Sequence, residues 1–117
     1  MRRFFFSVFS VPFLLSFVSC TMQEKALYSW YDYDNAAYKY QKELTDNSKA
    51  AFMTQMDKME KQCGQRGIVP PGYNAEYGFL LYNSGQAEKG LQYMKKEVEL
   101  YPESQLFIGG IIKRLEQ

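Results

Sequence analysis

Few residues in this 117-residue chain could carry acid–base or metal chemistry, because histidine is absent altogether. Its absence removes the commonest general base and the commonest metal ligand, which excludes Ser-His, Cys-His and zinc arrangements that depend on it. The acidic pairs Asp32/Asp34 and Glu97/Glu99 are spaced two residues apart, so on a helix each pair diverges by about 200° and cannot form a catalytic dyad. The sequence predicts a protein that is not an enzyme and that uses no cofactor or metal.

Aromatic side chains are the other residues that could act on a ligand, and the chain holds ten tyrosines, nine phenylalanines and one tryptophan. Such side chains offer a large and stiff contact area for a sugar or a peptide. Five of them lie between residues 30 and 40. Trp30, Tyr33 and Tyr40 share one helical face and are expected in the core, whereas Tyr31 and Tyr38 lie off that face and are candidate partner-binding residues.

The first 20 residues, MRRFFFSVFSVPFLLSFVSC, have the anatomy of a secretory signal, in which Arg2 and Arg3 precede an almost charge-free apolar run. The run is shorter than the roughly 20 residues of a membrane-spanning helix, and Pro12 interrupts it. We therefore expect residues 1–19 to be removed as a signal peptide rather than retained as a membrane anchor.

The end of that segment, SFVSC, resembles the lipobox of bacterial lipoproteins, with Phe17 where leucine is usual. The resemblance implies that Cys20 is lipidated and begins a tether over residues 20–26. Acyl chains at one site would anchor the protein firmly, since each buried methylene contributes about 0.8 kcal/mol. Thr21, in place of the aspartate typical of inner-membrane lipoproteins, favours the periplasmic face of the outer membrane. Ordinary signal cleavage, with Cys20 an incidental thiol, is the alternative.

Removal of residues 1–19 leaves 98 residues, 12 of them basic and 13 acidic, which is enough for one small domain. Because no basic patch is present, nucleic-acid binding is not expected. A lipidated Cys20 leaves Cys63 without a partner for an intramolecular disulfide. Cys63 continues an apolar helical stripe, which favours a packed thiol over a reactive one.

The elements that must position these residues are helices, since no stretch after residue 20 alternates polar and apolar side chains as a strand would. Apolar residues recur at spacings of three and four over Leu27–Leu44, which predicts a first helix. Thr45–Ser48 supplies N-cap residues for a second helix, which ends near Gly64 as its C-cap. The apolar stripe of this second helix consists of Phe52, Met56, Met59 and Cys63.

Three more helices are expected after a short loop: Pro71 to about Asn83, Ala87–Leu100 and Glu103–Leu115. Pro71 suits a first helical turn, Gly85 can take the positive φ of a turn, and Pro102 ends the fourth helix. The predicted class is all-α, with about five helices in antiparallel hairpins over residues 27–117. The residues of the last helix expected in the core are Phe107, Ile108, Ile111, Ile112 and Leu115.

The glycines of the second hairpin follow a 34-residue register that begins at Pro71. Positions 8, 15, 20 and 32 of that unit are Gly78, Gly85, Gly90 and Pro102. This spacing resembles the tetratricopeptide repeat, in which small residues at positions 8 and 20 let two helices approach closely. The resemblance implies a close-packed hairpin with tetratricopeptide-like stacking. Position 4 is Asn74 rather than a large apolar residue, and position 27, usually small, is Glu97, which would need a partner if buried.

Two segments carry a closer resemblance, LYSWYDYDNAAYKY and VPPGYNAEYGFLLYNSGQAEKGLQYMKKEVELYPES. They resemble the bacterial lipoproteins of domain-of-unknown-function family 4810, whose activity is uncharacterised. Members are often encoded beside a lipoprotein similar to the curli-secretion pore and another small lipoprotein, which implies an envelope complex.

These features predict a lipid-anchored envelope protein that binds another protein, either a pore-like lipoprotein or copies of itself. A short repeat with an open end would leave apolar surface free for docking. The alternative is a periplasmic lipoprotein that binds peptidoglycan or glycan through the aromatic first helix, with Tyr31 and Tyr38 as the contact residues.

Overall fold

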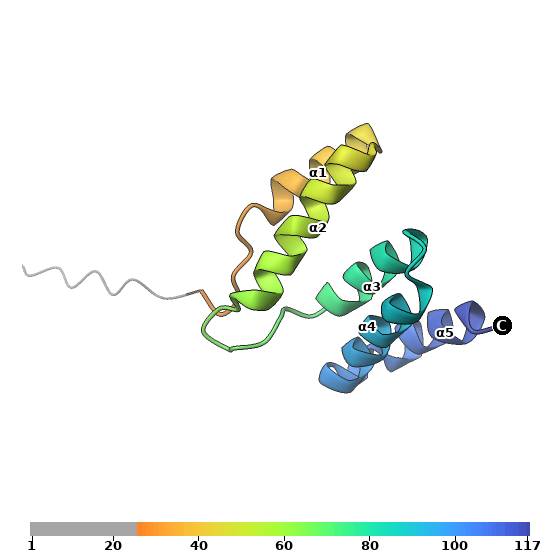
Figure 1. The fold of residues 1–117 in the computed structure, drawn as a ribbon. Helices are drawn as coiled ribbons and strands as arrows, with labels where there is room; N and C mark the ends of the chain where they lie inside the picture. The colour runs from red at the N-terminus through yellow and green to blue at the C-terminus, as the bar shows by residue number, and fades with distance from the viewer. Residues whose placement is uncertain (1–25) are drawn as a thin grey trace, which may run out of the picture.

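A computed structural model describes residues 26–117, and every regular element in that range is helical, which confirms the all-α class (Figure 1). No helix in the described range is long and apolar enough to cross a membrane. The expected signal peptide, Cys20 and the tether apart from Ala26 lie outside the described residues. In chain order the elements are α1 (Tyr33–Glu43), α2 (Asp46–Lys61), α3 (Tyr73–Asn83), α4 (Ala87–Leu100), the 3₁₀ turn η1 (Pro102–Ser104) and α5 (Gln105–Leu115).

Helices α1 and α2 lie side by side as a hairpin with a two-residue turn (Figure 1). Thr45 caps α2 as predicted: its side chain accepts the Ser48 amide at 3.2 Å, and the Ser48 hydroxyl accepts the Thr45 amide at 3.1 Å. Leu44 was expected on the buried face of the first helix, and that prediction is wrong. Leu44 takes a left-handed φ of 51° that ends α1, so its side chain is 74 % exposed.

The core of this hairpin forms around Phe52, Met56 and Met59, three of the four residues of the predicted apolar stripe. The fourth, Cys63, was expected in the same helix but lies beyond the end of α2 at Lys61. The Phe52 ring lies 5.5 Å from the ring of Tyr33 and 5.8 Å from that of Tyr40. Both tyrosines are half-buried and pack against the core from α1. Aromatic contacts therefore join the two helices.

Residues 27–32 are not helical, contrary to the prediction, so α1 begins six residues later than expected. The backbone amides of residues 65 and 66 donate to the carbonyl oxygens of residues 26 and 27 at 3.2 and 3.1 Å, which ties this segment to the loop after α2. Tyr31 has a φ of 48°, outside the right-handed helical region. Trp30, expected in the core, is consequently exposed, and Asp32 precedes α1 as its N-cap and shares no helix with Asp34.

Gly64 does not cap α2, which ends at Lys61 with Gln62 in the C-cap position. Its role is a close approach of two backbone segments, because a Cβ at Gly64 would lie 2.6 Å from the carbonyl oxygen of Leu27. Leu27 and Tyr28, which were expected in the first helix, therefore pack against residue 64, where only a glycine leaves room for their backbone.

A tight turn precedes α3, and Pro71 lies in this turn rather than in the first turn of the helix. The Tyr73 amide donates to the carbonyl oxygen of Pro70 at 3.2 Å, and Gly72 has a φ of 89°. Proline and glycine at the two central positions are typical of a type II turn, in which the second residue needs a positive φ. The helix therefore begins two residues later than predicted.

Helices α3 and α4 form the second hairpin and share the largest helix contact of the described residues. Gly78 and Gly90 face each other there, since a Cβ on Gly78 would lie 2.6 Å from the carbonyl oxygen of Gly90. The reverse distance, from a Cβ on Gly90 to the carbonyl oxygen of Gly78, would be 2.5 Å. Gly85 takes a φ of 87° in the connecting turn, and Pro102 opens η1 after α4.

Helix α5 follows η1 and packs on α4, with Ile108 and Ile112 against Met94 in a second core. Ile111 and Leu115 pack at its edge as expected. Phe107 was predicted to be buried, but its side chain is 71 % exposed. It lies one residue before Ile108, about 100° around the helix, and therefore faces away from α4.

Candidate functional site

The candidate site lies where α3 begins, and the side chain of Glu97 from α4 lines it. One carboxylate oxygen of Glu97 accepts the backbone amide of Gly72 at 2.6 Å, and the other accepts that of Asn74 at 3.1 Å. The first amides of a helix have no partner within it and carry partial positive charge, so a carboxylate is favourable there. The residue that departs from the repeat pattern thus caps the neighbouring helix, at 2 % exposure.

A hollow of about 500 Å³ opens beside this cap, between the start of α3, the end of α4, η1 and α5. Most of its surface is apolar. Tyr101 and Ile108 contribute buried side chains, Ala75 is half-buried, and Phe107 is exposed. The hydroxyl of Tyr101 donates to the carbonyl oxygen of Val69 at 2.5 Å, and burial above all raises the pKa of this tyrosine to about 12.

Three carboxylates line the same hollow, Glu76, Glu97 and Glu103, and no lysine or arginine is among the lining residues. Glu76 accepts a hydrogen bond of 2.6 Å from the neutral hydroxyl of Tyr33. The two ion pairs of the described residues, Lys95–Glu116 and Lys96–Glu60, involve none of the three. The hollow therefore combines an apolar surface with three carboxylates and has no lysine or arginine among its lining residues.

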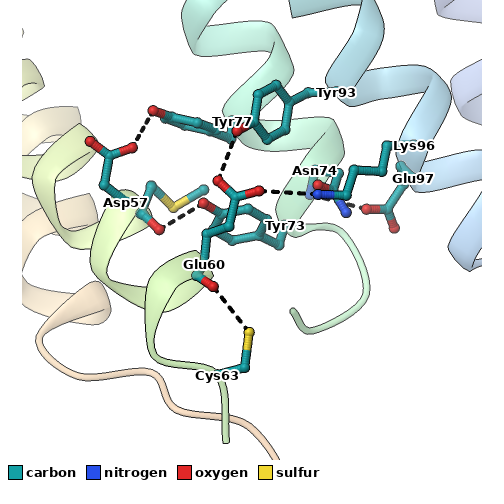
Figure 2. Close-up of polar contacts among 10 residues, drawn as sticks. Asp57, Glu60, Cys63, Tyr73, Asn74, Tyr77, Tyr93, Lys96 and Glu97 are labelled. Carbon is teal, nitrogen blue, oxygen red and sulfur yellow. Dashed lines mark hydrogen bonds and ion pairs between the residues drawn. The ribbon is translucent and has the colours of Figure 1, made fainter. Parts of the chain in front are cut away.

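The second hairpin is held against α2 by tyrosine hydroxyls, as Figure 2 shows. Tyr77 donates to a carboxylate oxygen of Asp57, and Tyr93 donates to Glu60 at 2.7 Å. Tyr73 donates to the backbone carbonyl oxygen of α2 residue 56 at 2.6 Å. Burial, followed by the nearby carboxylates, raises the pKa values of these three tyrosines well above the ordinary 10.

This interface keeps the hydroxyls protonated and places α3 and α4 in one orientation relative to α2. Lys96 adds an ion pair with Glu60 at 3.0 Å, on the same side of α4 as Tyr93 (Figure 2). Two of the helices that line the hollow, α3 and α4, are therefore held by contacts with α2, which suits a preformed binding site.

The family described as a domain of unknown function, DUF4810, matches residues 27–111. The chain belongs to this family. Searches among curated proteins and among solved structures found no match.

Tyr31 and Tyr38 of this DUF4810 protein are both exposed, and neither lines the hollow. The Tyr31 hydroxyl donates to the carbonyl oxygen of Gln62 at 2.8 Å, and the ammonium of Lys58 lies 4.3 Å from the centre of its ring. The contacts of Tyr31 are therefore within the chain. Tyr38 is 66 % exposed, with Lys42 5.8 Å from its ring centre, and it leaves more of its ring free.

Cys63 and Asn74 are polar or reactive side chains that lie near the two cores. Cys63 is half-buried against the first core, and its thiol donates to the carbonyl oxygen of Glu60 at 3.2 Å. Asn74 is fully buried, and neither polar atom of its side chain has a hydrogen-bond partner in the chain. Among residues 26–117, no three acidic or cysteine side chains gather closely enough to hold a metal ion.

Most of the residues that line the hollow were not predicted from the sequence. Glu76, Tyr101 and Glu103 were not candidates, and Phe107 was assigned to the core. The one available signal was Glu97, a carboxylate at a position that the repeat pattern reserves for a small residue.

Proposed function

We propose that this protein is a lipid-anchored protein of the cell envelope that acts as a protein–protein interaction module or accessory subunit. The observation that carries the proposal is the apolar hollow of about 500 Å³ beside the exposed ring of Phe107. Large apolar side chains that border a preformed hollow are typical of surfaces that dock a partner.

The envelope location rests on the signal-like first 20 residues and on the SFVSC sequence that ends with Cys20. A lipid at Cys20 would tether the helical domain to the periplasmic face of the outer membrane. A pore-like lipoprotein of the same membrane, or a second copy of this chain, is the candidate partner. The facing glycines Gly78 and Gly90 support a tetratricopeptide-like packing of α3 and α4, a type of hairpin that often serves in assembly.

The test is a pull-down of the tagged full-length protein from membranes solubilised in a mild detergent. We expect recovery of a defined partner or of a homo-oligomer, and a lone monomer under these conditions would contradict the proposal. Cys20→Ser tests the anchor separately: the variant should lose incorporation of labelled palmitate and leave the membrane fraction. If the Cys20→Ser variant still incorporated labelled palmitate and stayed in the membrane fraction, lipidation at this residue would be excluded.

The second candidate function is binding of peptidoglycan or another glycan, favoured by the exposed ring of Tyr38. Aromatic rings stack on sugar faces. Tyr38→Ala, alone and with Tyr31→Ala, should then reduce sedimentation of the protein with cell-wall sacculi. Unchanged sedimentation would exclude a glycan site on this segment.

A further inference from the structure

We infer that the hollow between α3 and α5 receives a basic segment of a partner protein, in which an arginine or lysine side chain is flanked by apolar residues. The inference rests on the proposed interaction function and adds to it the chemistry of the partner. It derives from the charges and the apolar walls that meet in the hollow.

The first argument is charge. Glu76, Glu97 and Glu103 line one hollow without a basic residue among their neighbours there. The groups that satisfy two of these carboxylates are neutral, since Glu76 binds the Tyr33 hydroxyl and Glu97 binds two backbone amides. The start of α3 offsets part of the Glu97 charge, whereas Glu76 and Glu103 face no cation among the lining residues, and low-dielectric walls concentrate their field in the hollow. A cationic side chain is the complement that this field selects.

The second argument is the apolar lining, which makes a small inorganic cation or a wholly polar peptide a poor fit. Arginine and lysine carry apolar stems that pack along apolar surface while the charged end reaches a carboxylate. The exposed ring of Phe107 offers a face on which a guanidinium can stack. Ala75 and Ile108 leave apolar surface for the neighbours of that basic residue.

The third argument is size and position. A hollow of about 500 Å³ is large enough for a few side chains and too small for a folded domain. Its lining residues come from the first residues of α3, the end of α4, η1 and α5. A short segment of a partner, rather than a broad flat surface, matches these dimensions.

The experiment selects short random peptides, displayed on phage, against the protein as the cell produces it, purified in mild detergent. We expect enriched peptides to contain arginine or lysine beside apolar residues. One enriched peptide is then synthesised with a fluorescent label, and its dissociation constant is measured by anisotropy. An absence of enriched peptides, or enrichment of peptides without a basic residue, would overturn the inference.

Two variants with matched controls locate the binding. Glu103→Lys should weaken binding at least about tenfold, whereas Glu99→Lys, the same charge change on an exposed α4 residue outside the hollow, should change it less than about twofold. Phe107→Ser should also weaken binding about tenfold, against a small change for Leu106→Ser, its exposed neighbour. Equal binding by Glu103→Lys and the unchanged protein would overturn the inference. Binding should also weaken as salt rises, because an exposed carboxylate is screened.

The same variants separate this inference from the proposed function. A partner recovered in the pull-down that binds Glu103→Lys and Phe107→Ser normally would leave the interaction function standing and overturn the basic-segment inference. Dimers seen by analytical ultracentrifugation and abolished by Glu103→Lys would identify a second copy as the occupant, which would also overturn it. Recovery of a lone monomer in the pull-down would instead contradict the proposed interaction function itself.

Discussion

The packing of α3 on α4 is tested most directly by adding one methyl group at Gly78. A Cβ there would lie 2.6 Å from the carbonyl oxygen of Gly90 and 2.9 Å from Cγ of Met94, well inside ordinary contact. The first of these atoms belongs to the backbone, so α4 as a whole has to move. Overpacking of this kind costs about 1–3 kcal/mol, while alanine in a helix gains up to about 1 kcal/mol over glycine. We expect Gly78→Ala to lower the free energy of unfolding by about 1–2 kcal/mol.

Gly110→Ala is the matched control, since Gly110 is also inside a helix and a Cβ there would meet nothing within 4 Å. Without a clash, only the helix preference remains, and the free energy of unfolding should rise by up to about 1 kcal/mol. Both variants are measured by urea unfolding followed by circular dichroism and by thermal unfolding. In a domain of this size each kcal/mol corresponds to about 4–8 °C in Tm.

The reasoning is refuted if Gly78→Ala is as stable as Gly110→Ala, because the two positions would then not differ in packing. The larger change Gly78→Leu extends the series, and it should separate the two helices and lower the helical signal. A folded Gly78→Leu variant with an unchanged Tm would also contradict a close contact at this position.

Three other predictions concern buried polar groups. Glu97→Ala should destabilise the protein by about 3 kcal/mol, since two amides at the start of α3 lose a charged acceptor, while exposed Glu99→Ala should stay within about 0.5 kcal/mol in the same urea titration. Asn74→Leu should stabilise it by about 1–3 kcal/mol, because the asparagine side chain is buried without a hydrogen-bond partner; a lower Tm would show that this amide is satisfied in solution. Alkaline pH should unfold the protein: the pKa of Tyr101 is raised from 10.0 to about 12 in the fold, so the stability it contributes is intact below pH 10 and is lost as pH rises through 12. Phenolate absorbance and circular dichroism measure this together, and ionisation of every tyrosine near pH 10 with the helices intact would contradict it.

The helices and their turns were largely predictable because their determinants are local. Thr45 caps α2 through a residue three positions away, and the apolar stripe of α2 follows from contacts on one helical face. Gly85 has the positive φ that its place between two helical segments predicts. Such signals act within a few residues, so they can be read before the chain is folded.

The errors at the ends of elements came from contacts between distant parts of the chain. Apolar spacing continues back to Leu27, yet residues 26 and 27 are hydrogen-bonded to residues 65 and 66, and this pairing replaces a helical start. Gly64 was assigned to a C-cap, the local role of a glycine after a helix, whereas its place is a close approach to Leu27. The spacing of apolar residues within a segment does not depend on a hydrogen-bond partner almost forty positions away, so it cannot predict that contact.

The sequence by itself therefore determined the all-α class, the order of the helices and the positions of most turns. The tertiary structure decided what the polar and aromatic residues do. Glu97 is an anomaly in the sequence and becomes a helix cap once α4 lies beside the start of α3. Phe107 belongs by spacing to an apolar run, and it is exposed because α4 and side chains of α3 cover only the side of α5 that carries Ile108 and Ile112. The physical reason is that local preference depends on neighbours in the chain, whereas burial, charge compensation and the shape of a hollow depend on which surfaces meet after folding.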